Sequence, residues 1–155
     1  MRSLILAAAL AAALPSHGTL VPGRSLGGIR LGATPAQVEA AWGRFFGRCR
    51  GCAAPTWYFT YGKFRATGLG VQFRQGRVEA LFTLARPAGW HTPRGLVLGD
   101  AVARLTQLYG ALLRNQCNGY TAYLLPARSV TTEFYVAGGT VWGFGLTRTG
   151  LSACR

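Results

Sequence analysis

The pattern of apolar and polar positions divides the chain into two similar stretches, each opening with a short segment of helical spacing. The first helix is predicted at 35–42. There Thr34 and Gln37 can form a capping box, Pro35 suits the first helical position, and Gly43 is placed to end the helix. The apolar side chains at positions 38, 41 and 42 share one face, which should pack against a sheet.

The second stretch repeats this arrangement. A helix is predicted at 101–109, with Asp100 as its cap and Gly110 at its end. Trp42 and Tyr109 lie on the apolar faces of the two helices, so both rings are expected to be buried against strand residues. Two short helices at matched places, each with its own start and stop signals, indicate a duplicated unit.

Six strands are predicted from the density of aromatic and β-branched residues. They lie at 56–61, 70–74 and 77–84 in the first stretch and at 120–125, 130–136 and 140–147 in the second. Gln75-Gly76 and Gly138-Gly139 read as tight hairpin turns at corresponding places. The predicted fold class is α+β, with two tandem repeats, each a short helix packed on an antiparallel sheet of about three to four strands.

The repeat begins at a glycine-bounded phrase, which runs from Gly28 to Gly32 and recurs from Gly95 to Gly99. The two phrases are 67 residues apart, a period that is too long for a solenoid unit. We expect repeat one at 19–86 and repeat two at 87–155, packed together as one globular unit because each alone is marginal for independent folding. The segment 85–94, which contains two prolines, is expected to be a short stiff connection.

The order of these elements resembles the repeat of the β-lactamase-inhibitor-protein-like (BLIP-like) fold. It is also similar to the small outer-membrane-assembly lipoproteins of the SmpA/OmlA type. The residues that carry the resemblance are Gly28, Leu31, Gly32, Thr34, Val38, Trp42, Gly43, Tyr58, Phe73, Gly76 and Val78, then Gly95, Leu98, Gly99, Asp100, Leu105, Tyr109, Gly110, Phe134, Gly139 and Val141. The resemblance implies a non-catalytic role, because those families contain an enzyme inhibitor and a scaffold lipoprotein. No inhibitory residue carries over.

The N-terminus has the order of a secretory signal peptide. One positive charge precedes the apolar run Leu4–Leu14, which Pro15 ends, and small residues follow to Gly18. We therefore predict a signal peptide at 1–18 and a location that is secreted, periplasmic or in the cell envelope. The run is shorter than the about 20 residues that a spanning helix needs, so no transmembrane segment is expected after processing. No cysteine follows the run, which argues against a lipoprotein anchor.

The four cysteines of an exported chain indicate disulfides. The favoured pairs are Cys49–Cys52 and Cys117–Cys154, and the main alternative links the repeats through Cys49 and Cys117. The chain-entropy model assigns about 4 kcal/mol to the longer loop and about 2 kcal/mol to the shorter one. The Cys-x-x-Cys spacing also allows a redox site, but here it follows a helix, whereas reactive thiols stand at helix N-termini.

The charge is strongly basic, with 17 Lys and Arg against four acids and a formal net charge of +13. Such a field attracts polyanions and also keeps a protein soluble. The candidate binding surface comprises Arg44, Arg48, Arg50, Arg65, Arg74 and Arg77. Aromatic residues lie among these arginines as on a nucleic-acid surface, but export makes nucleic acid an unexpected physiological partner.

The sequence offers little material for catalysis. The acids are scattered, His91 is the one histidine after the signal peptide, and no Gly-x-Ser-x-Gly elbow is present. We predict no catalytic, metal or cofactor-binding residues and no cofactor, because the phosphate-loop and zinc-ligand spacings are missing.

The leading hypothesis is therefore an exported, non-catalytic interaction module that binds a protein, as an inhibitor or a scaffold does. The alternative is an electrostatic binder of anionic cell-envelope polymers. An unrecognised hydrolase dependent on His91, or a Cys-x-x-Cys redox protein, comes third.

Overall fold

The computed structural model describes residues 13–155. Most of the predicted signal peptide at 1–18 lies outside the described residues, so it stays a prediction. No helix within the described range is long and apolar enough to cross a membrane.

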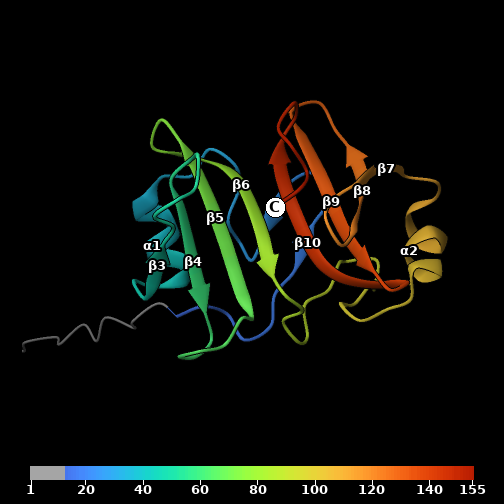
Figure 1. The fold of residues 1–155 in the computed structure, drawn as a ribbon, viewed down its shortest axis with the longest axis horizontal. Coiled ribbons are helices and arrows are strands. Elements are labelled where there is room, and N and C mark those ends of the chain that lie inside the picture. Colours follow the sequence, from blue (N-terminus) through green and yellow to red (C-terminus); the bar gives the residue numbers. More distant parts are fainter. Residues whose placement is uncertain (1–12) are drawn as a thin grey trace, which may run out of the picture.

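A single antiparallel sheet of eight strands dominates the structure, in the order β3-β4-β5-β6-β10-β9-β8-β7 (Figure 1). Its strands are β3 (Phe46–Arg48), β4 (Thr56–Thr60), β5 (Gly68–Arg74), β6 (Arg77–Leu84), β7 (Leu113–Gln116), β8 (Thr121–Pro126), β9 (Val130–Ala137) and β10 (Thr140–Arg148). Two helices, α1 (Pro35–Trp42) and α2 (Val102–Tyr109), and a short ribbon of β1 (Leu20–Val21) and β2 (Ser25–Leu26) complete the fold. The α+β class is confirmed.

Each half of the chain contributes a helix followed by four strands, and the halves meet where β6 pairs with β10. The six predicted strands are present with small shifts at their ends. The edge strands β3 and β7 and the β1–β2 ribbon were not predicted. In Figure 1 the two four-stranded groups lie side by side, with α1 beside one group and α2 beside the other.

The first helix begins as its sequence predicts. The Thr34 side chain accepts a hydrogen bond from the Gln37 backbone N–H, and the Gln37 side chain accepts one from the Thr34 backbone. The predicted cap of the second helix is wrong: Ala101 occupies the cap position and makes no side-chain cap bond. The Asp100 carboxylate instead accepts a hydrogen bond from the Val97 N–H at 2.8 Å, because it closes the glycine-bounded turn before the helix.

One face of the sheet is covered by both helices, the β1–β2 ribbon and the connector, and the main core lies there. Trp42 is 2% exposed and meets Phe59 edge-on at 5.4 Å, as predicted. Tyr109 is only half-buried, not buried as predicted, although its ring does lie against a strand residue, 5.0 Å from the ring of Phe134 on β9. These two ring contacts involve non-equivalent strands of the halves, β4 and β9.

The glycine-bounded phrases make matching backbone contacts in the two halves. The Gly32 N–H donates to Val78 of β6 at 2.7 Å, and the Gly99 N–H donates to Val141 of β10 at 2.7 Å. Both glycines have positive φ, 83° and 109°, a conformation that side chains disfavour. The shared glycine pattern thus fixes how each phrase attaches to the last strand of its half.

The segment 85–94 is more than a connection. Trp90 is fully buried, and its indole N–H donates to the Tyr61 hydroxyl at 2.9 Å. The backbone of His91 pairs with Thr19 and Val97, while its side chain is exposed. The segment therefore contributes Trp90 to the core.

Both favoured disulfides are present, Cys49–Cys52 and Cys117–Cys154, with Cα–Cα distances of 5.7 and 5.5 Å. No cysteine in the described part of the chain is free. The second bridge ties the C-terminal residues to the end of β7, in the same half.

Candidate binding face

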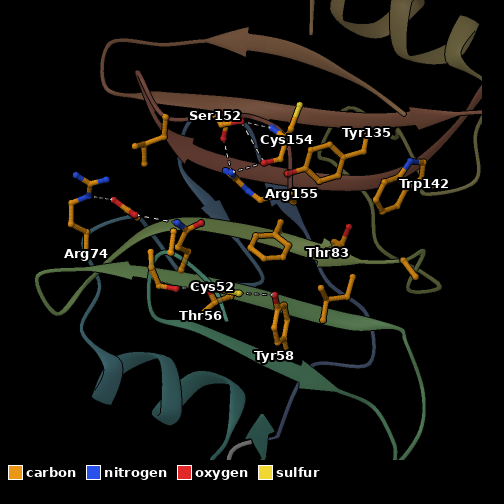
Figure 2. Close-up of a pocket in the computed structure, with 18 residues that line it drawn as sticks. Cys52, Thr56, Tyr58, Arg74, Thr83, Tyr135, Trp142, Ser152, Cys154 and Arg155 are labelled. Atoms are coloured by element: carbon orange, nitrogen blue, oxygen red, sulfur yellow. Dashed lines mark hydrogen bonds and ion pairs between the residues drawn. The ribbon is translucent and has the colours of Figure 1, made fainter. Parts of the chain in front are cut away.

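The second face of the sheet carries no helix and contains a cavity of about 610 Å³ at the junction of the two halves. Strands β4, β5, β6, β9 and β10, the loop after Cys52 and the segment 151–155 line it. Figure 2 shows Tyr58 on one side of this space, with Tyr135 and Trp142 on the other. We call this surface the open face.

A row of glycines and large side chains crosses the open face from strand to strand. Cross-strand pairing places Gly47 beside Tyr58, Tyr58 beside Gly70, Gly70 beside Phe82, and Phe82 beside Gly145. Directly paired residues of an antiparallel sheet project from the same face. Each aromatic ring in this row is therefore flanked by glycines, which leave room for it to lie down on the sheet.

The neighbouring aromatic rings explain why these positions need glycine. A Cβ at Gly70 would lie 2.3 Å from the Phe82 ring, and one at Gly145 would lie 2.2 Å from the Tyr135 hydroxyl oxygen. A Cβ at Gly143, which pairs with Tyr135, would lie 2.7 Å from that ring. Because the rings occupy this space, they form a low aromatic floor with a cavity above it.

Two acid–arginine pairs flank the aromatic floor. At one end, the Arg74 Nε donates to Glu79 Oε2 at 2.7 Å, and the Gln72 amide approaches Oε1 at 3.4 Å. The Glu79 side chain is 1% exposed, whereas that of Arg74 is 57% exposed. This pair therefore joins a buried carboxylate to a cation that reaches solvent.

The second pair lies in the other half. The Tyr135 hydroxyl donates to Glu133 Oε2 at 2.6 Å, and the Arg155 guanidinium lies 3.8 Å from Glu133 Oε1. Burial raises the pKa of the Glu133 carboxyl, opposed by the Arg155 charge and by hydrogen bonds from Tyr135 and Thr147. Burial, with the nearby Glu133 charge, raises the pKa of the Tyr135 hydroxyl well above its usual value.

The segment 151–155, which we call the strap, lies across the junction of the halves (Figure 1). The disulfide at Cys154 and a hydrogen bond of 2.6 Å from the Arg155 N–H to the Tyr120 hydroxyl hold it in place. The Arg155 guanidinium bonds to Thr147 of β10 and lies 5.6 Å from the Phe82 ring of β6. One side chain thus contacts both halves and forms part of the cavity wall.

The six arginines of the predicted surface are exposed and lie at two ends of the first half. Arg44 follows α1 and Arg65 lies in the β4–β5 loop, at the end of the sheet where β4 finishes. The other four lie toward the opposite end: Arg48 on β3, Arg50 after it, and Arg74 and Arg77 around the β5–β6 hairpin. Among these six, Arg74 alone lines the cavity.

Within residues 13–155, no group of three or more His, Cys, Asp or Glu side chains is arranged to hold a metal ion. The His91 ring lies 3.1 Å from the Gly89 carbonyl oxygen and does not line the cavity. The Cys49–Cys52 bridge follows an edge strand, and Cys52 Sγ lies 3.7 Å from the Tyr58 hydroxyl at the cavity rim.

Sequence reasoning missed most of the cavity lining. The sequence pattern places Phe82, Tyr135 and Trp142 in predicted strands without marking them as site residues, and Glu79 and Glu133 stand among the scattered acids. A usable signal existed: Glu133 and Tyr135 are two apart in one strand and so share a face, and glycines interrupt the strand partners of Tyr135 and Phe82.

No protein-family model matches the chain, and neither does any curated protein. Among solved structures, the chain is similar to YjgB of Bacillus subtilis, a DUF4309 family protein, with a TM-score of 0.56 and 16% identity over 76% of this chain and 79% of YjgB. It is also similar to an extracellular protein containing an SCP domain from Bacillus anthracis, with a TM-score of 0.53 and 9% identity over 77% of this chain. This chain spans 44% of that longer protein. These likenesses establish a shared fold only, and the resemblance to the BLIP-like and SmpA/OmlA repeats stays a prediction.

Proposed function

We propose that the protein is an exported, non-catalytic interaction module that binds a partner protein on its open face. The observation that supports this most directly is the cavity of about 610 Å³ on the sheet face that carries no helix, lined by aromatic rings and by the strap. Aromatic and arginine side chains around a concave patch are typical of the residues that dominate protein–protein binding energy. Two disulfides and the likeness to a domain of an extracellular protein support a location outside the cytoplasm.

The chemistry of the cavity favours an uncharged, apolar group of the partner. Glu79 compensates Arg74, and Glu133 compensates Arg155, so the cavity carries little net charge on a chain of formal charge +13. The half-buried rings of Tyr58 and Trp142 supply apolar area, whereas the rings of Phe82 and Tyr135, which also line the cavity, are almost fully buried. A protruding loop with an aromatic or aliphatic side chain would complement this surface.

The groups at the cavity are engaged in structural contacts, which supports a binding role over a catalytic one. The Glu133 carboxylate is 1% exposed, accepts from Tyr135 and faces Arg155, so it is not placed to reach a substrate in the cavity. Cys52 and Cys154, which line the cavity, are both in disulfides.

We further propose that the two halves descend from one duplicated αβ unit. Matched strand order about the β6–β10 pair and matched bonds from Gly32 and Gly99 to the last strand of each half support this. The open face at the junction would then be a feature of the assembled pair, since neither half has the whole cavity lining.

The test is affinity capture from the extracellular and envelope fraction, followed by a dissociation constant for each recovered protein after purification. Ala53 lies at the cavity rim and is exposed, so Ala53→Trp should fill the cavity mouth without disturbing the core. Ala103→Trp is the matched control, because Ala103 is exposed on α2, away from the open face.

We expect a captured protein to bind the wild type, to lose at least about tenfold in affinity with Ala53→Trp, and to keep its affinity with Ala103→Trp. A partner lost through Ala103→Trp and kept by Ala53→Trp would place binding on the helical side. Failure to recover any protein that distinguishes the two variants would count against the proposal.

The alternative, electrostatic binding of anionic envelope polymers, is favoured by the placement of the acids. Two of the four, Glu79 and Glu133, are buried, so the accessible surface is more basic than the composition suggests. Polymer binding of this kind should weaken steeply as salt is raised and should be insensitive to Ala53→Trp.

A further inference from the structure

The end of the first half where β4 finishes carries two phenylalanines that are almost fully exposed. Phe64, in the loop between β4 and β5, is 97% exposed, and Phe45, between α1 and β3, is 89% exposed. Leaving a phenyl ring in water forgoes the gain that burial would bring. Large exposed rings in one region indicate an interaction site.

The strand register brings the two rings to the same end of the sheet. Phe46 pairs with Phe59, so Phe45 lies next to Thr60, and Thr60 pairs with Gly68 at the base of the loop that carries Phe64. Phe45, Thr60 and Tyr61 also line one small depression. We call this region, comprising residues 43–45 and 61–67, the tip.

The loop backbone holds the Phe64 ring away from the sheet. Phe64 has a φ of 66°, in the left-handed region that bulky residues rarely adopt. Such strain persists where the surrounding structure imposes it and concentrates at functional sites. The ring is therefore presented to the outside by the loop conformation.

The charges around these rings are positive. The Lys63 ammonium lies 5.7 Å from the centre of the Phe64 ring, and Arg65 follows in the same loop. Arg86 is exposed just beyond β6, whose last residue, Leu84, pairs with Gly68 at the loop base. Of the tip cations, only Arg44 forms an ion pair with an acid in the described part of the chain. Its partner is Glu39, at 3.3 Å.

We propose that the tip docks onto an anionic lipid bilayer, with Phe64 and Phe45 inserted at the level of the headgroups. Basic residues near a surface are attracted to anionic lipids, and apolar rings gain from insertion into the interface. A soluble polyanion would satisfy the cations but would offer no apolar phase for the rings. This site shares no residue with the cavity of the open face, so it does not depend on the proposed function.

The N-terminal end of the described chain lies at the same place. Ala13 and Leu14, the last two residues of the apolar run, line the depression that contains Phe45 and Tyr61. A chain still held at the membrane by its export sequence would therefore meet the bilayer with this end of the molecule.

The experiment is co-sedimentation of the exported, processed protein with vesicles of phosphatidylcholine, with and without phosphatidylglycerol. The N-terminus is first established by mass spectrometry, so that an unprocessed apolar run cannot cause binding. Phe64→Ala and Phe45→Ala test the rings, and Leu113→Ala is the matched control. Leu113 is also exposed, at 65%, but lies on β7 at the far edge of the sheet.

Charge is tested by a matched pair of double variants. Lys63→Gln with Arg65→Gln removes two charges from the tip. Arg128→Gln with Arg148→Gln removes two exposed charges near the β8–β9 turn, which lies in the second half at the end of the sheet opposite to the tip. Melting curves of all variants confirm that each is folded.

We expect binding to vesicles that contain phosphatidylglycerol, and a loss of about tenfold for each phenylalanine variant with little change for Leu113→Ala. The tip charge variant should lose far more than the control charge variant. Equal losses from both charge variants with no effect of Phe64→Ala would show general polyanion attraction and overturn the proposal. The proposal would also be overturned if the protein did not bind vesicles and Phe64→Ala instead weakened its binding to a purified protein partner.

Discussion

Replacing Gly70 by alanine should destabilise the protein through a single contact. The added Cβ would lie 2.3 Å from two atoms of the Phe82 ring, whereas non-bonded carbons prefer separations of about 3.5 to 4.0 Å. The ring or the strand must therefore move by more than about 1 Å. Apart from this clash, alanine would be preferred to glycine in a strand, because alanine loses less backbone entropy on folding.

The size of the effect follows from where the ring can go. Phe82 is 6% exposed, and the Arg155 guanidinium and the Tyr58 ring lie 5.6 and 6.5 Å from its centre. The open side is the cavity, so the ring should tilt into it. Overpacking of this kind costs about 1 to 3 kcal/mol, which for a chain of this size lowers the melting temperature by about 3 to 10 °C.

The control is Gly47→Ala, in the same cross-strand row. Gly47 pairs with Tyr58, has an ordinary negative φ, and would place its Cβ with nothing within 4 Å. We expect this variant to be neutral or more stable by up to about 1 kcal/mol. Thermal and urea unfolding of both variants decides the matter. Equal stabilities for Gly70→Ala and Gly47→Ala would refute the account of the aromatic floor.

Three further predictions concern the disulfides, the buried acid and the connector histidine. Replacing both Cys117 and Cys154 by alanine should lower the free energy of unfolding more than replacing both Cys49 and Cys52, because the longer loop restrains the unfolded chain more. The chain-entropy model puts the difference between the two variants at about 2 kcal/mol. Urea unfolding of the two variants measures this difference, and a larger loss from the short loop would contradict the prediction. Because burial raises the pKa of Glu133, the folded state holds that proton more tightly than the unfolded state. The stability of the wild type relative to Glu133→Gln should therefore fall as the pH rises from 4.5 and then level off. A relative stability that rises over this range would show that the pKa of Glu133 is not raised in the folded state. His91→Ala should stay within about 0.5 kcal/mol of the wild type and leave partner binding unchanged, and any ester, peptide or glycoside hydrolysis abolished by this variant would refute the non-catalytic proposal.

The elements that could be predicted from the sequence are those with local causes. The first helix begins and ends as expected because its start signal, the Thr34–Gln37 capping box, and its stop signal, Gly43, each act on backbone groups only a few residues away. The edge strands β3 and β7 were missed because segments such as Leu113–Gln116, exposed throughout, have no apolar alternation of their own. They are strands because β4 and β8 offer them backbone partners, and that information is not local.

The candidate site was hidden for a related reason. Its floor exists only when β6 pairs with β10 in the register that places Phe82 beside Gly145, and the sequence left open whether the halves share a sheet. The cap of the second helix shows the same limit on a smaller scale. Asp100 has the right chemistry, but its carboxylate is engaged by the Val97 N–H in the preceding turn.

The placement of the few acids separates two regions with different expected responses to salt. On the open face, buried Glu79 and Glu133 compensate Arg74 and Arg155. At the tip, Lys63 and Arg65 form no ion pair within residues 13–155.

Exposed charges are screened over a Debye length of about 8 Å at physiological ionic strength, whereas apolar contacts in a cavity are not screened. Raising the salt concentration should therefore weaken vesicle binding at the tip steeply and leave partner affinity at the cavity nearly constant. Titrating one protein preparation against both partners over a range of sodium chloride concentrations measures the two slopes. Equal slopes would mean that a single diffuse electrostatic attraction governs both contacts, and the division of the surface into two sites would then be wrong.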